Sequence, residues 1–366
     1  MSAAPGSLVL MTAGGTGGHV YPALAVANEL LARGYRVEWV GTRRGLEHRV
    51  VPAAGITLHC LPVRGVRGKS VVHKLLGLGY LALAAVQALW LVYRRAPRCV
   101  VGMGGYVAGP AGVAAWLLRK PLLIHEQNAV AGTTNRMLAP LAAKVVAAFA
   151  GAFAERQDCV VLGNPVRSQL VEAAAARPYD YAGQRPLRLL VLGGSLGAQP
   201  INQMLPTVVA RLNDTGPQLE VWHQAGDAHA ELVQRAYVEL AVSAVRVAPF
   251  IEDMAAAYAW ADLVICRAGA LTVSELAVMG RPAILVPLPY AIDDHQSANA
   301  RYLAQRGAAV LLPQAEMSEA RLVADLHGFL AAPAQLATMA RAALAAATPE
   351  ATAQVSDCCE ELIRGC

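Results

Sequence analysis

The sequence has 366 residues, 55% of them hydrophobic, and a formal net charge of +5. This length exceeds one ordinary hydrophobic core and predicts two domains of roughly 150 to 200 residues each. The seven cysteines are odd in number, scattered and without a C-x-x-C pair, which argues against a disulfide framework or a zinc site and favours a reducing cytoplasm. Residues 1–7 lack a basic segment, and the apolar run after them is short, so we expect no signal peptide.

The charge is divided unevenly along the chain. Residues 1–150 contain 16 of the 31 Lys and Arg residues but only 4 of the 26 acidic residues, so this part carries +12 and the remainder −7. A basic half joined to an acidic half predicts that the first half meets an anionic surface or ligand. Nucleic acid and anionic lipid are both candidates on this evidence.

Short apolar runs alternate with amphipathic stretches, which predicts an α/β fold. In the first half we expect helices at 20–32 and 75–92, and strands at 8–11, 36–40, 56–61, 98–101 and 121–124. After the proline-containing segment 177–186, the second half repeats the pattern, with strands expected at 187–192, 219–223, 245–248, 263–266 and 283–286. We expect a first domain of residues 1–166, joined by a C-terminal helix within 349–366, and a second domain of residues 167–348.

The segment Leu75–Val92 has no charged residue, and basic pairs flank it at 73–74 and 94–95. A transmembrane helix is disfavoured, because glycines, Tyr80 and Gln87 dilute the segment and its length is at the lower limit for spanning. Two interpretations remain. The segment is a mostly buried domain helix or an interfacial helix with a basic collar, and the two can coexist.

Two glycine-rich turns lie about half a chain apart, each directly after an apolar run: Gly14–Gly18 and Gly193–Ala198. A strand that ends in glycines and opens a helix exposes backbone N–H groups at the positive end of the helix dipole, where a phosphate can bind. Two such turns predict two anionic ligands in one cleft. His19 begins the helix after the first turn, where the dipole disfavours its protonated form and suits it to accept a proton.

Dinucleotide binding is the competing interpretation of these glycines. The G-x-G-x-x-G pattern fails in the first half because Val20 and Val107 stand where its third glycine is required, and the turn at 193–198 has no G-x-G. Glu38, near the second predicted strand, keeps nicotinamide binding open. The run ending in Gly68-Lys69-Ser70 is not a Walker A loop, because Val63 stands where that motif needs glycine.

Five motifs occur in a fixed order: Gly14-Gly15-Thr16-Gly17-Gly18-His19-Val20-Tyr21-Pro22, Gly102-Met103-Gly104-Gly105-Tyr106, His125-Glu126-Gln127-Asn128, Gly163-Asn164-Pro165-Val166-Arg167 and Arg267-Ala268-Gly269-Ala270-Leu271-Thr272-Val273-Ser274-Glu275. Asp293-Asp294-His295-Gln296 with Asn299 extends the series over nearly the whole chain. Together these motifs resemble the bacterial undecaprenyldiphospho-muramoylpentapeptide β-N-acetylglucosaminyltransferases, the MurG family. One departure is Leu196, where the family usually carries glutamine.

The resemblance implies a GT-B glycosyltransferase fold, in which two Rossmann-like domains face a central cleft. The first domain would bind the acceptor and the second the donor, UDP-GlcNAc. The implied reaction is inverting transfer of GlcNAc to the 4-hydroxyl of MurNAc in undecaprenyl-pyrophosphoryl-MurNAc-pentapeptide, which converts lipid I to lipid II in peptidoglycan synthesis. This links the chain to cell-wall biogenesis, cell shape and cell division.

The same resemblance implies roles for individual residues. His19 would be the catalytic base, Glu275 would bind the donor ribose, and Gln296 would bind the GlcNAc hydroxyls. The main chain of Ile251 would contact uracil. The other residues implied along the donor are Thr16, Gly17, Gly18, Asn128, Arg167, Ser195, Ala270, Leu271, Thr272, Val273 and Ser274. The first turn would also meet the acceptor's diphosphate.

On the acceptor and membrane side, the implied residues are Arg64, Arg67, Lys69 and Tyr106. The expected partners are an anionic membrane surface and cell-wall synthesis proteins, with no nucleic acid, and the expected location is peripheral, on the cytoplasmic face of the bacterial inner membrane. No Asp-x-Asp occurs, so we expect neither a metal nor a cofactor. Backbone N–H groups, a helix N-terminus and arginine would stabilise the departing UDP instead.

Three other functions stay open at this point, because one fold can support several chemistries. A UDP-GlcNAc epimerase on the same kind of fold would leave the basic half and the segment 75–92 unexplained. A dinucleotide oxidoreductase is disfavoured by the glycine spacing. A non-catalytic membrane scaffold would bind without releasing UDP.

Overall fold

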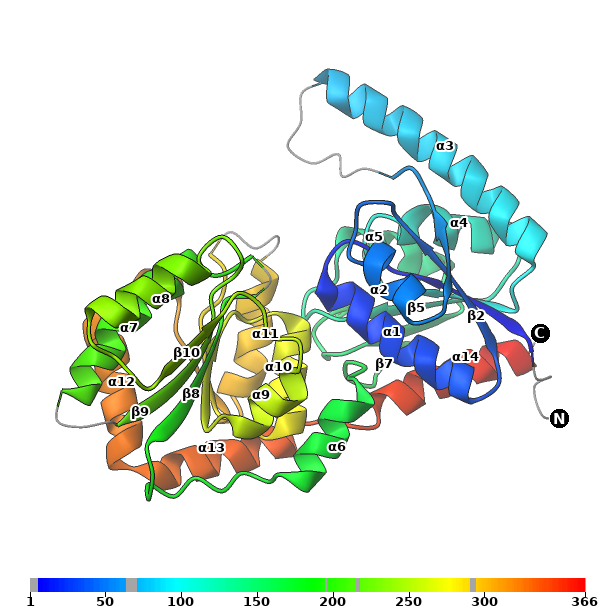
Figure 1. The fold of residues 1–366 in the computed structure, drawn as a ribbon. Coiled ribbons are helices and arrows are strands. Elements are labelled where there is room, and N and C mark those ends of the chain that lie inside the picture. Colours follow the sequence, from blue (N-terminus) through cyan, green and yellow to red (C-terminus); the bar gives the residue numbers. More distant parts are fainter. Residues whose placement is uncertain (1–5, 64–70, 195, 215–217, 290–293, 366) are drawn as a thin grey trace. The chain divides into compact units, whose positions relative to one another are not determined.

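The computed structural model describes residues 6–63, 71–194, 196–214, 218–289 and 294–365 (Figure 1). The chain divides into two compact units: unit 1 comprises Met1–Arg167 and Pro349–Cys366, and unit 2 comprises Ser168–Thr348. Four residues with predicted binding roles, Arg64, Arg67, Lys69 and Ser195, lie outside the described residues.

Unit 1 is built on a parallel sheet. Among the described residues it has seven strands in the order β3-β2-β1-β4-β5-β6-β7. Their bounds are β1 (Leu8–Thr12), β2 (Arg36–Gly41), β3 (Thr57–Cys60), β4 (Cys99–Gly102), β5 (Leu122–Glu126), β6 (Lys144–Ala147) and β7 (Cys159–Val161). The strand order reverses at β1 and β4, and such a switch point is where ligands bind in open parallel sheets.

Helices cover both faces of this sheet. They are α1 (Gly17–Ala32), α2 (Glu47–Ala53), α3 (Val71–Arg95), α4 (Ala108–Leu117), α5 (Thr133–Leu138) with the short turn η1 (Ala139–Leu141), and α14 (Ala351–Arg364). Alternate residues of β1 point to opposite faces: Val9 and Met11 pack against α1 and α14, whereas Leu10 packs against α3 and α4. The sheet is therefore buried on both sides, as parallel sheets usually are.

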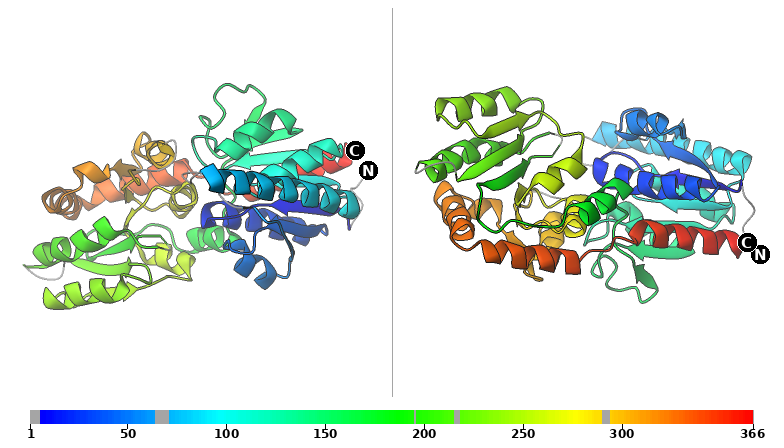
Figure 2. Two further views of the ribbon diagram at one scale, coloured as in Figure 1. Left: turned by 90° about the horizontal axis from the view of Figure 1, so that it is seen from above. Right: turned by 60° about the horizontal axis from the view of Figure 1, so that its bottom comes forward.

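Helix α14 follows unit 2 in the chain but lies along α1 of unit 1 (Figures 1 and 2). Its residues Val355, Cys359 and Ile363 are buried in the same apolar cluster as β1. Arg33 at the end of α1 also forms ion pairs with Asp357 and Glu360. The C-terminal helix is thus part of the core of the first unit.

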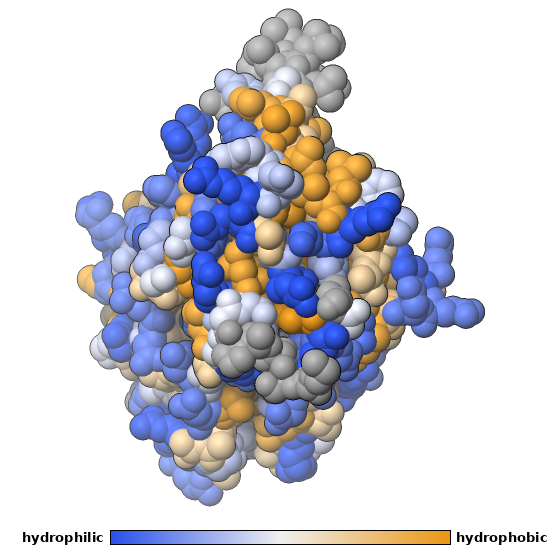
Figure 3. All heavy atoms as spheres, turned by 90° about the vertical axis from the view of Figure 1, so that its right-hand side faces the viewer, coloured by the Kyte–Doolittle hydropathy of each residue, from blue (hydrophilic) through white to orange (hydrophobic). Residues whose placement is uncertain are grey.

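Helix α3 is longer than the predicted 75–92 and less buried. Of residues 79–95, only Ala84, Ala88, Leu91 and Val92 are buried, so the interpretation as a mostly buried helix does not hold for this part. The buried residues form one narrow stripe, and Figure 3 shows hydrophobic side chains gathered near the top, where α3 lies. Within the described parts of the chain, no helix has both the length and the apolar run needed to cross a bilayer.

Unit 2 has the second parallel sheet. Within its described residues, six strands have the order β10-β9-β8-β11-β12-β13. Their bounds are β8 (Leu187–Leu192), β9 (Leu219–Gln224), β10 (Val245–Ala248), β11 (Leu263–Cys266), β12 (Ala283–Leu285) and β13 (Ala309–Leu311). The helical elements are α6 (Ser168–Ala176), α7 (Gln199–Asn213), α8 (Ala230–Glu239), α9 (Met254–Trp260), α10 (Ala270–Met279), α11 (His295–Ala304), η3 (Gln314–Glu316), α12 (Glu319–Ala331) and α13 (Pro333–Ala345).

Candidate active site

The predicted site residues collect at the carboxyl ends of strands in both units. Apart from Arg167, the described ones follow β1, β4 and β5 in unit 1, and β10, β11 and β12 in unit 2. Because the strands of each sheet are parallel, these ends share one edge of that sheet, which is the edge where ligands of open α/β sheets bind. Each unit therefore has one candidate binding edge.

The first glycine turn joins β1 to α1, with Thr16 as the extended N-cap residue and Gly17 as the first helical residue. A buried carboxylate that the sequence analysis did not single out holds this turn. Glu47 accepts hydrogen bonds from Gly15 N at 3.0 Å, from Thr42 N at 2.9 Å and from the Thr42 hydroxyl at 2.7 Å. A Cβ on Gly14 would lie only 2.8 Å from Glu47 Oε1, so glycine is required there for close approach.

The second glycine-rich turn of unit 1, after β4, packs directly on the first. Gly104 and Gly105 both have positive φ, and a Cβ on Gly105 would overlap the carbonyl of Gly14. A Cβ on Gly104 would lie 2.7 Å from His19 Cδ2. Because they have no side chain, these glycines allow the loop after β4 to pack directly against the His19 ring. Tyr106 follows them and is 55% exposed.

The segment after β5 is a buried polar network. Glu126 accepts hydrogen bonds from the Asn128 main chain at 2.9 Å, from the Asn128 side chain at 3.1 Å and from Asn135 Nδ2 at 2.8 Å. His125 Nε2 bonds to Gly163 O at 2.9 Å, and burial lowers the pKa of His125 to about 4 despite this bond. His125 is therefore neutral at physiological pH, and Asn128 is held at the carboxyl edge of the sheet.

Arg167 lies in unit 1, where its guanidinium stacks over the ring of Tyr21 on α1 at 5.3 Å from the ring centre. Tyr21 belongs to the motif that contains His19. The structure therefore brings Arg167 to the helix that follows the first glycine turn.

In unit 2, neutral side chains hold the glycine turn between β8 and α7. Gln224 Nε2 donates to Gly194 O at 3.0 Å, and Gln224 Oε1 accepts from Ile251 N at 2.9 Å. The Ile251 N–H is thus used within the protein. Leu196, the departure from the family pattern, is 85% exposed.

A second network lies beneath this turn. Asn202 donates to Ala225 O at 2.8 Å and accepts from His223 Nε2 at 3.0 Å, while His223 Nδ1 lies 3.1 Å from the Tyr237 hydroxyl. Burial lowers the pKa of His223 to about 3, so this histidine is also neutral. The network holds the Ala225 carbonyl in close contact with Gly197. A Cβ on Gly197 would overlap this carbonyl.

Helix α10 has the predicted donor residues Ala270, Leu271, Thr272, Val273, Ser274 and Glu275 in its first two turns. Glu275 is 5% exposed and accepts a hydrogen bond from the Tyr258 hydroxyl at 3.1 Å, so it is not an ordinary surface acid. Ser274 Oγ bonds back to Ala270 O at 3.0 Å. Tyr258, which the sequence analysis did not single out, orients the Glu275 carboxylate.

Two further side chains lie at the same edge of unit 2. Gln296, near the start of α11, accepts from Leu288 N at 2.9 Å. Arg267, at the end of β11, donates to Val286 O and Pro287 O at 3.2 Å each and to Gln314 Oε1 at 2.7 Å. Its burial lowers the pKa of the guanidinium.

Glu38 is not available to a nicotinamide ribose. Its carboxylate accepts hydrogen bonds from Arg95 Nε at 2.8 Å and from His59 Nε2 at 2.8 Å. Burial alone would raise the pKa of Glu38, but these bonds outweigh that effect and the pKa lies below its usual range. This pairing removes the remaining sequence argument for a dinucleotide oxidoreductase.

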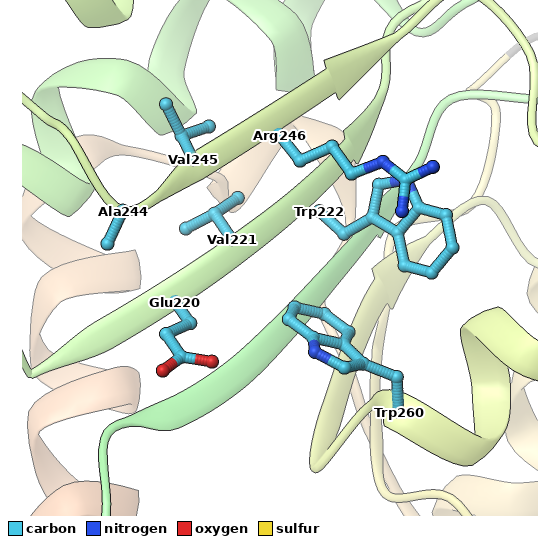
Figure 4. A pocket seen from close by; sticks show the side chains of 7 residues that line it. All are labelled: Glu220, Val221, Trp222, Ala244, Val245, Arg246 and Trp260. Atoms are coloured by element: carbon cyan, nitrogen blue, oxygen red, sulfur yellow. The ribbon is translucent and has the colours of Figure 1, made fainter.

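A cavity of about 400 Å³ lies away from these edges, on the strands of unit 2 (Figure 4). Arg246 stacks over Trp222 at 4.1 Å, and the rings of Trp222 and Trp260 meet edge to face at 5.8 Å. None of the predicted site residues lines it. Among the described residues, no cluster of three His, Cys, Asp or Glu side chains could hold a metal ion.

Comparison with known proteins gives a consistent result. Residues 9–147 match the N-terminal domain of glycosyltransferase family 28, and residues 188–355 match its C-terminal domain. The chain is 53% identical over 364 residues to the UDP-N-acetylglucosamine–N-acetylmuramyl-(pentapeptide) pyrophosphoryl-undecaprenol N-acetylglucosamine transferase of Pseudomonas putida, covering 99% of this chain and 100% of that protein.

Solved structures extend the comparison. The structure of Acinetobacter baumannii MurG is 40% identical, with a TM-score of 0.80 and coverage of 97% of this chain and 99% of that one. A Neisseria meningitidis UDP-GlcNAc 2-epimerase is 13% identical, with a TM-score of 0.66 and coverage of 96% and 98%, which is a likeness of fold alone.

Proposed function

The chain belongs to glycosyltransferase family 28 and to its MurG branch, and from this premise we propose its reaction. It transfers GlcNAc from UDP-GlcNAc to the 4-hydroxyl of MurNAc in undecaprenyl-pyrophosphoryl-MurNAc-pentapeptide, with inversion at the anomeric carbon. The observation that carries the proposal is the position of His19 and Glu275, each on the helix that follows a central strand at the carboxyl edge of its own sheet.

Unit 2 binds the donor in this proposal. The Glu275 carboxylate, held by Tyr258, accepts hydrogen bonds from the ribose hydroxyls, and the Ile251 carbonyl accepts from uracil. Gln296 contacts the GlcNAc hydroxyls, and Ser195 keeps the donor role that the sequence suggests. The first turn of α10 provides backbone donors from Ala270 to Thr272 for the diphosphate, because the Val273 N–H already bonds to Gly269 O at 2.9 Å.

Unit 1 binds the acceptor and activates its hydroxyl. Thr16, Gly17 and Gly18 provide hydroxyl and amide donors at the start of α1 for the acceptor diphosphate, and we extend to them the donor contact that the family resemblance implies. His19 takes the proton of the MurNAc 4-hydroxyl as this oxygen attacks the anomeric carbon of GlcNAc. UDP departs with the electron pair of the broken bond, and helix N-termini and Arg167 stabilise its developing charge.

Helix α3 binds an anionic membrane surface in this proposal. Leu83, Val86, Trp90 and Tyr93 form one exposed apolar stripe opposite the buried side of the helix, and we call it the α3 stripe. Arg94 stacks over Trp90 at 5.0 Å, which places a cation beside the stripe. An exposed apolar face with adjacent basic residues is typical of proteins that lie on a membrane, where a lipid-linked acceptor is anchored.

Vesicle sedimentation tests this part. We expect V86S/W90S to bind vesicles rich in phosphatidylglycerol several-fold more weakly than the unmodified protein. The matched control is L232S/V238S on α8, where both side chains are equally exposed but lie in unit 2. Equal vesicle binding by the two double variants would contradict the proposal that α3 is the membrane-binding surface.

The reaction itself is tested by mass spectrometry of the protein with UDP-GlcNAc and a short-chain lipid-linked muramoyl pentapeptide. We expect a product heavier by one GlcNAc, a β-linkage in its NMR spectrum, and UDP released only when the acceptor is present. Conversion of UDP-GlcNAc alone, without that product, would favour an epimerase.

A further inference from the structure

The side-chain oxygen of Gln127 is buried next to the residues of the candidate site, and no role has been assigned to it above. The residue is 1% exposed, directly after β5, and its main-chain oxygen accepts a hydrogen bond from Asn164 Nδ2 at 3.0 Å. Its side-chain nitrogen bonds to His125 Nδ1 and to His125 O, both at 3.1 Å. Among the described residues, Gln127 Oε1 has no hydrogen-bond partner. A buried acceptor left unpaired costs free energy and needs a physical reason.

The orientation of this amide follows from its neighbours. His125 Nε2 lies 2.9 Å from the Gly163 carbonyl, which can only accept, so Nε2 carries the proton. His125 is neutral, and its Nδ1 therefore has a lone pair that needs a donor. The NH₂ group of Gln127, 3.1 Å from this nitrogen, provides it. The oxygen of Gln127 must face the opposite way.

That oxygen faces the space beside Gly104. A Cβ on Gly104 would lie 3.6 Å from Gln127 Oε1 and 3.0 Å from His19 Nε2, so both atoms border the volume that the missing side chain leaves. The other ring nitrogen of His19 lies on the open side, where Nδ1 is 3.4 Å from the hydroxyl of the exposed Thr16. The imidazole thus has Nε2 toward the buried network and Nδ1 toward the exposed turn.

The two atoms are not hydrogen-bonded in this structure, but both border the same small volume. We propose that Gln127 is a positioning residue for His19: a small rotation of the imidazole brings its Nε2–H to Gln127 Oε1, and this bond fixes the tautomer in which Nδ1 is the base. This inference rests on the proposed function, in which His19 deprotonates the acceptor. The MurNAc 4-hydroxyl gives its proton to Nδ1, its oxygen bonds to the anomeric carbon, and the bond from that carbon to UDP breaks with both electrons leaving on UDP. The imidazolium that results keeps Nε2–H on Gln127.

A double-mutant cycle separates this role from a merely structural one. We expect Q127M to lower kcat about tenfold in the unmodified protein, the size of one hydrogen bond, but less than twofold in the H19A background. Q335M is the matched control, because Gln335 is exposed on α13 of unit 2 and its replacement leaves kcat unchanged. Equal losses in both backgrounds would overturn the positioning role while leaving His19 as the base.

The cycle also distinguishes this inference from the proposed reaction. If H19A keeps full turnover, both the base and its positioning residue are wrong, although product formation still supports the transferase. If the unmodified protein makes no product, the proposed function itself fails. The acidic limb of the kcat profile gives a further readout: we expect it to move to lower pH in Q127M, because the imidazolium loses an acceptor.

A measurement on the unmodified protein covers the case in which Q127M does not fold. Nitrogen-15 NMR of histidine-labelled protein, with the His19 signals assigned by their absence in H19A, reports which ring nitrogen carries the proton. We expect Nε2–H for His19 above its titration range. Protonation at Nδ1 in the neutral ring would overturn the proposal.

Discussion

The two glycine-rich turns share a backbone arrangement, but different groups hold them. Glu47, a carboxylate, accepts from Gly15 N in unit 1, whereas Gln224, an amide, donates to Gly194 O in unit 2. The first turn therefore loses an N–H to a protein anion that also repels phosphate. In the second turn Gly193 N donates to Gln224 O and Gly197 N to Gly194 O, at 3.1 Å each, so the groups that hold it are uncharged. A similar glycine pattern has thus produced two environments, and the one in unit 2 is better suited to an anionic donor.

This difference assigns separate tasks to the two units. The turn in unit 1 leads to His19, with the amides of Gly17 and Gly18 as the donors that follow Gly15. The turn in unit 2 follows β8, the sheet neighbour of β11, and β11 leads into α10, where Tyr258 holds Glu275. Variants of unit 1 should therefore change the chemical step, and variants of unit 2 should change donor affinity.

The largest effect is expected for H19A. Removal of a general base typically costs a factor of about 10² to 10⁴ in turnover. Donor affinity should stay within twofold, as measured by calorimetric titration with UDP-GlcNAc. The control is H48A, since His48 is an exposed histidine of unit 1. A large loss of donor affinity in H19A would contradict the assignment of donor binding to unit 2 and of the chemical step to unit 1.

E47A tests what holds the first turn. It removes three hydrogen bonds to a buried group, and we expect a loss of about 3 kcal/mol in the unfolding free energy of unit 1. Hydrogen exchange should rise in peptides covering 8–32 but not in those covering 187–213. The exposed acid Glu155 provides the control E155A. Unchanged exchange in both segments would show that Glu47 does not hold the turn.

E275A tests the donor side. Loss of a charged acceptor for the ribose hydroxyls should weaken UDP-GlcNAc binding about 10- to 100-fold, with a smaller change in kcat at saturating donor. E239A, at an exposed position at the end of α8, is the control. Unchanged UDP-GlcNAc affinity in E275A would contradict the proposal that Glu275 binds the ribose.

The smallest expected effect is a loss of unfolding free energy at acidic pH, and it should be similar in the two units. His125 in unit 1 and His223 in unit 2 have folded pKa values of about 4 and about 3, below the usual 6.5. The unfolded chain therefore takes up these protons first as the pH falls, and each unit loses about 1 kcal/mol of unfolding free energy between pH 7 and pH 5.5. Urea denaturation at the two pH values measures this loss. Equal or greater stability at pH 5.5 would contradict it.

The strands of unit 2 were predictable because short apolar runs alternate there with amphipathic stretches. Strands 187–192, 245–248 and 263–266 have the predicted bounds. The missed strands β6, β7 and β13 have three or four residues, and so short an apolar run does not by itself distinguish a strand from a loop or a buried helical turn. The strands β10 and β11 are equally short and were predicted only because the segments around them continue the alternating pattern. For α3 the sequence left a buried helix and an interfacial helix both open, because its apolar residues occur on nearly all sides.

The site was predictable only where residues belong to contiguous motifs. His19 and Glu275 stand in such motifs, although their roles in this chain stay predictions. Glu47 was missed because it contacts Gly15 across 32 positions of sequence. Tyr258 lies 17 positions before Glu275 in an alanine-rich helix, where it resembles an ordinary core residue. Contacts that only the fold creates leave little local pattern.

The placement of α14 has a consequence for how the protein is made. Unit 2 is one continuous stretch of chain, whereas unit 1 lacks α14 until the residues after Thr348 have been synthesised. Until then Val355, Cys359 and Ile363 are missing from the apolar cluster around β1 and α1. On the ribosome unit 2 can complete its hydrophobic core first. Unit 1, although its first residues are made earlier, still exposes apolar surface to water at that time. The order of maturation then reverses the order of translation.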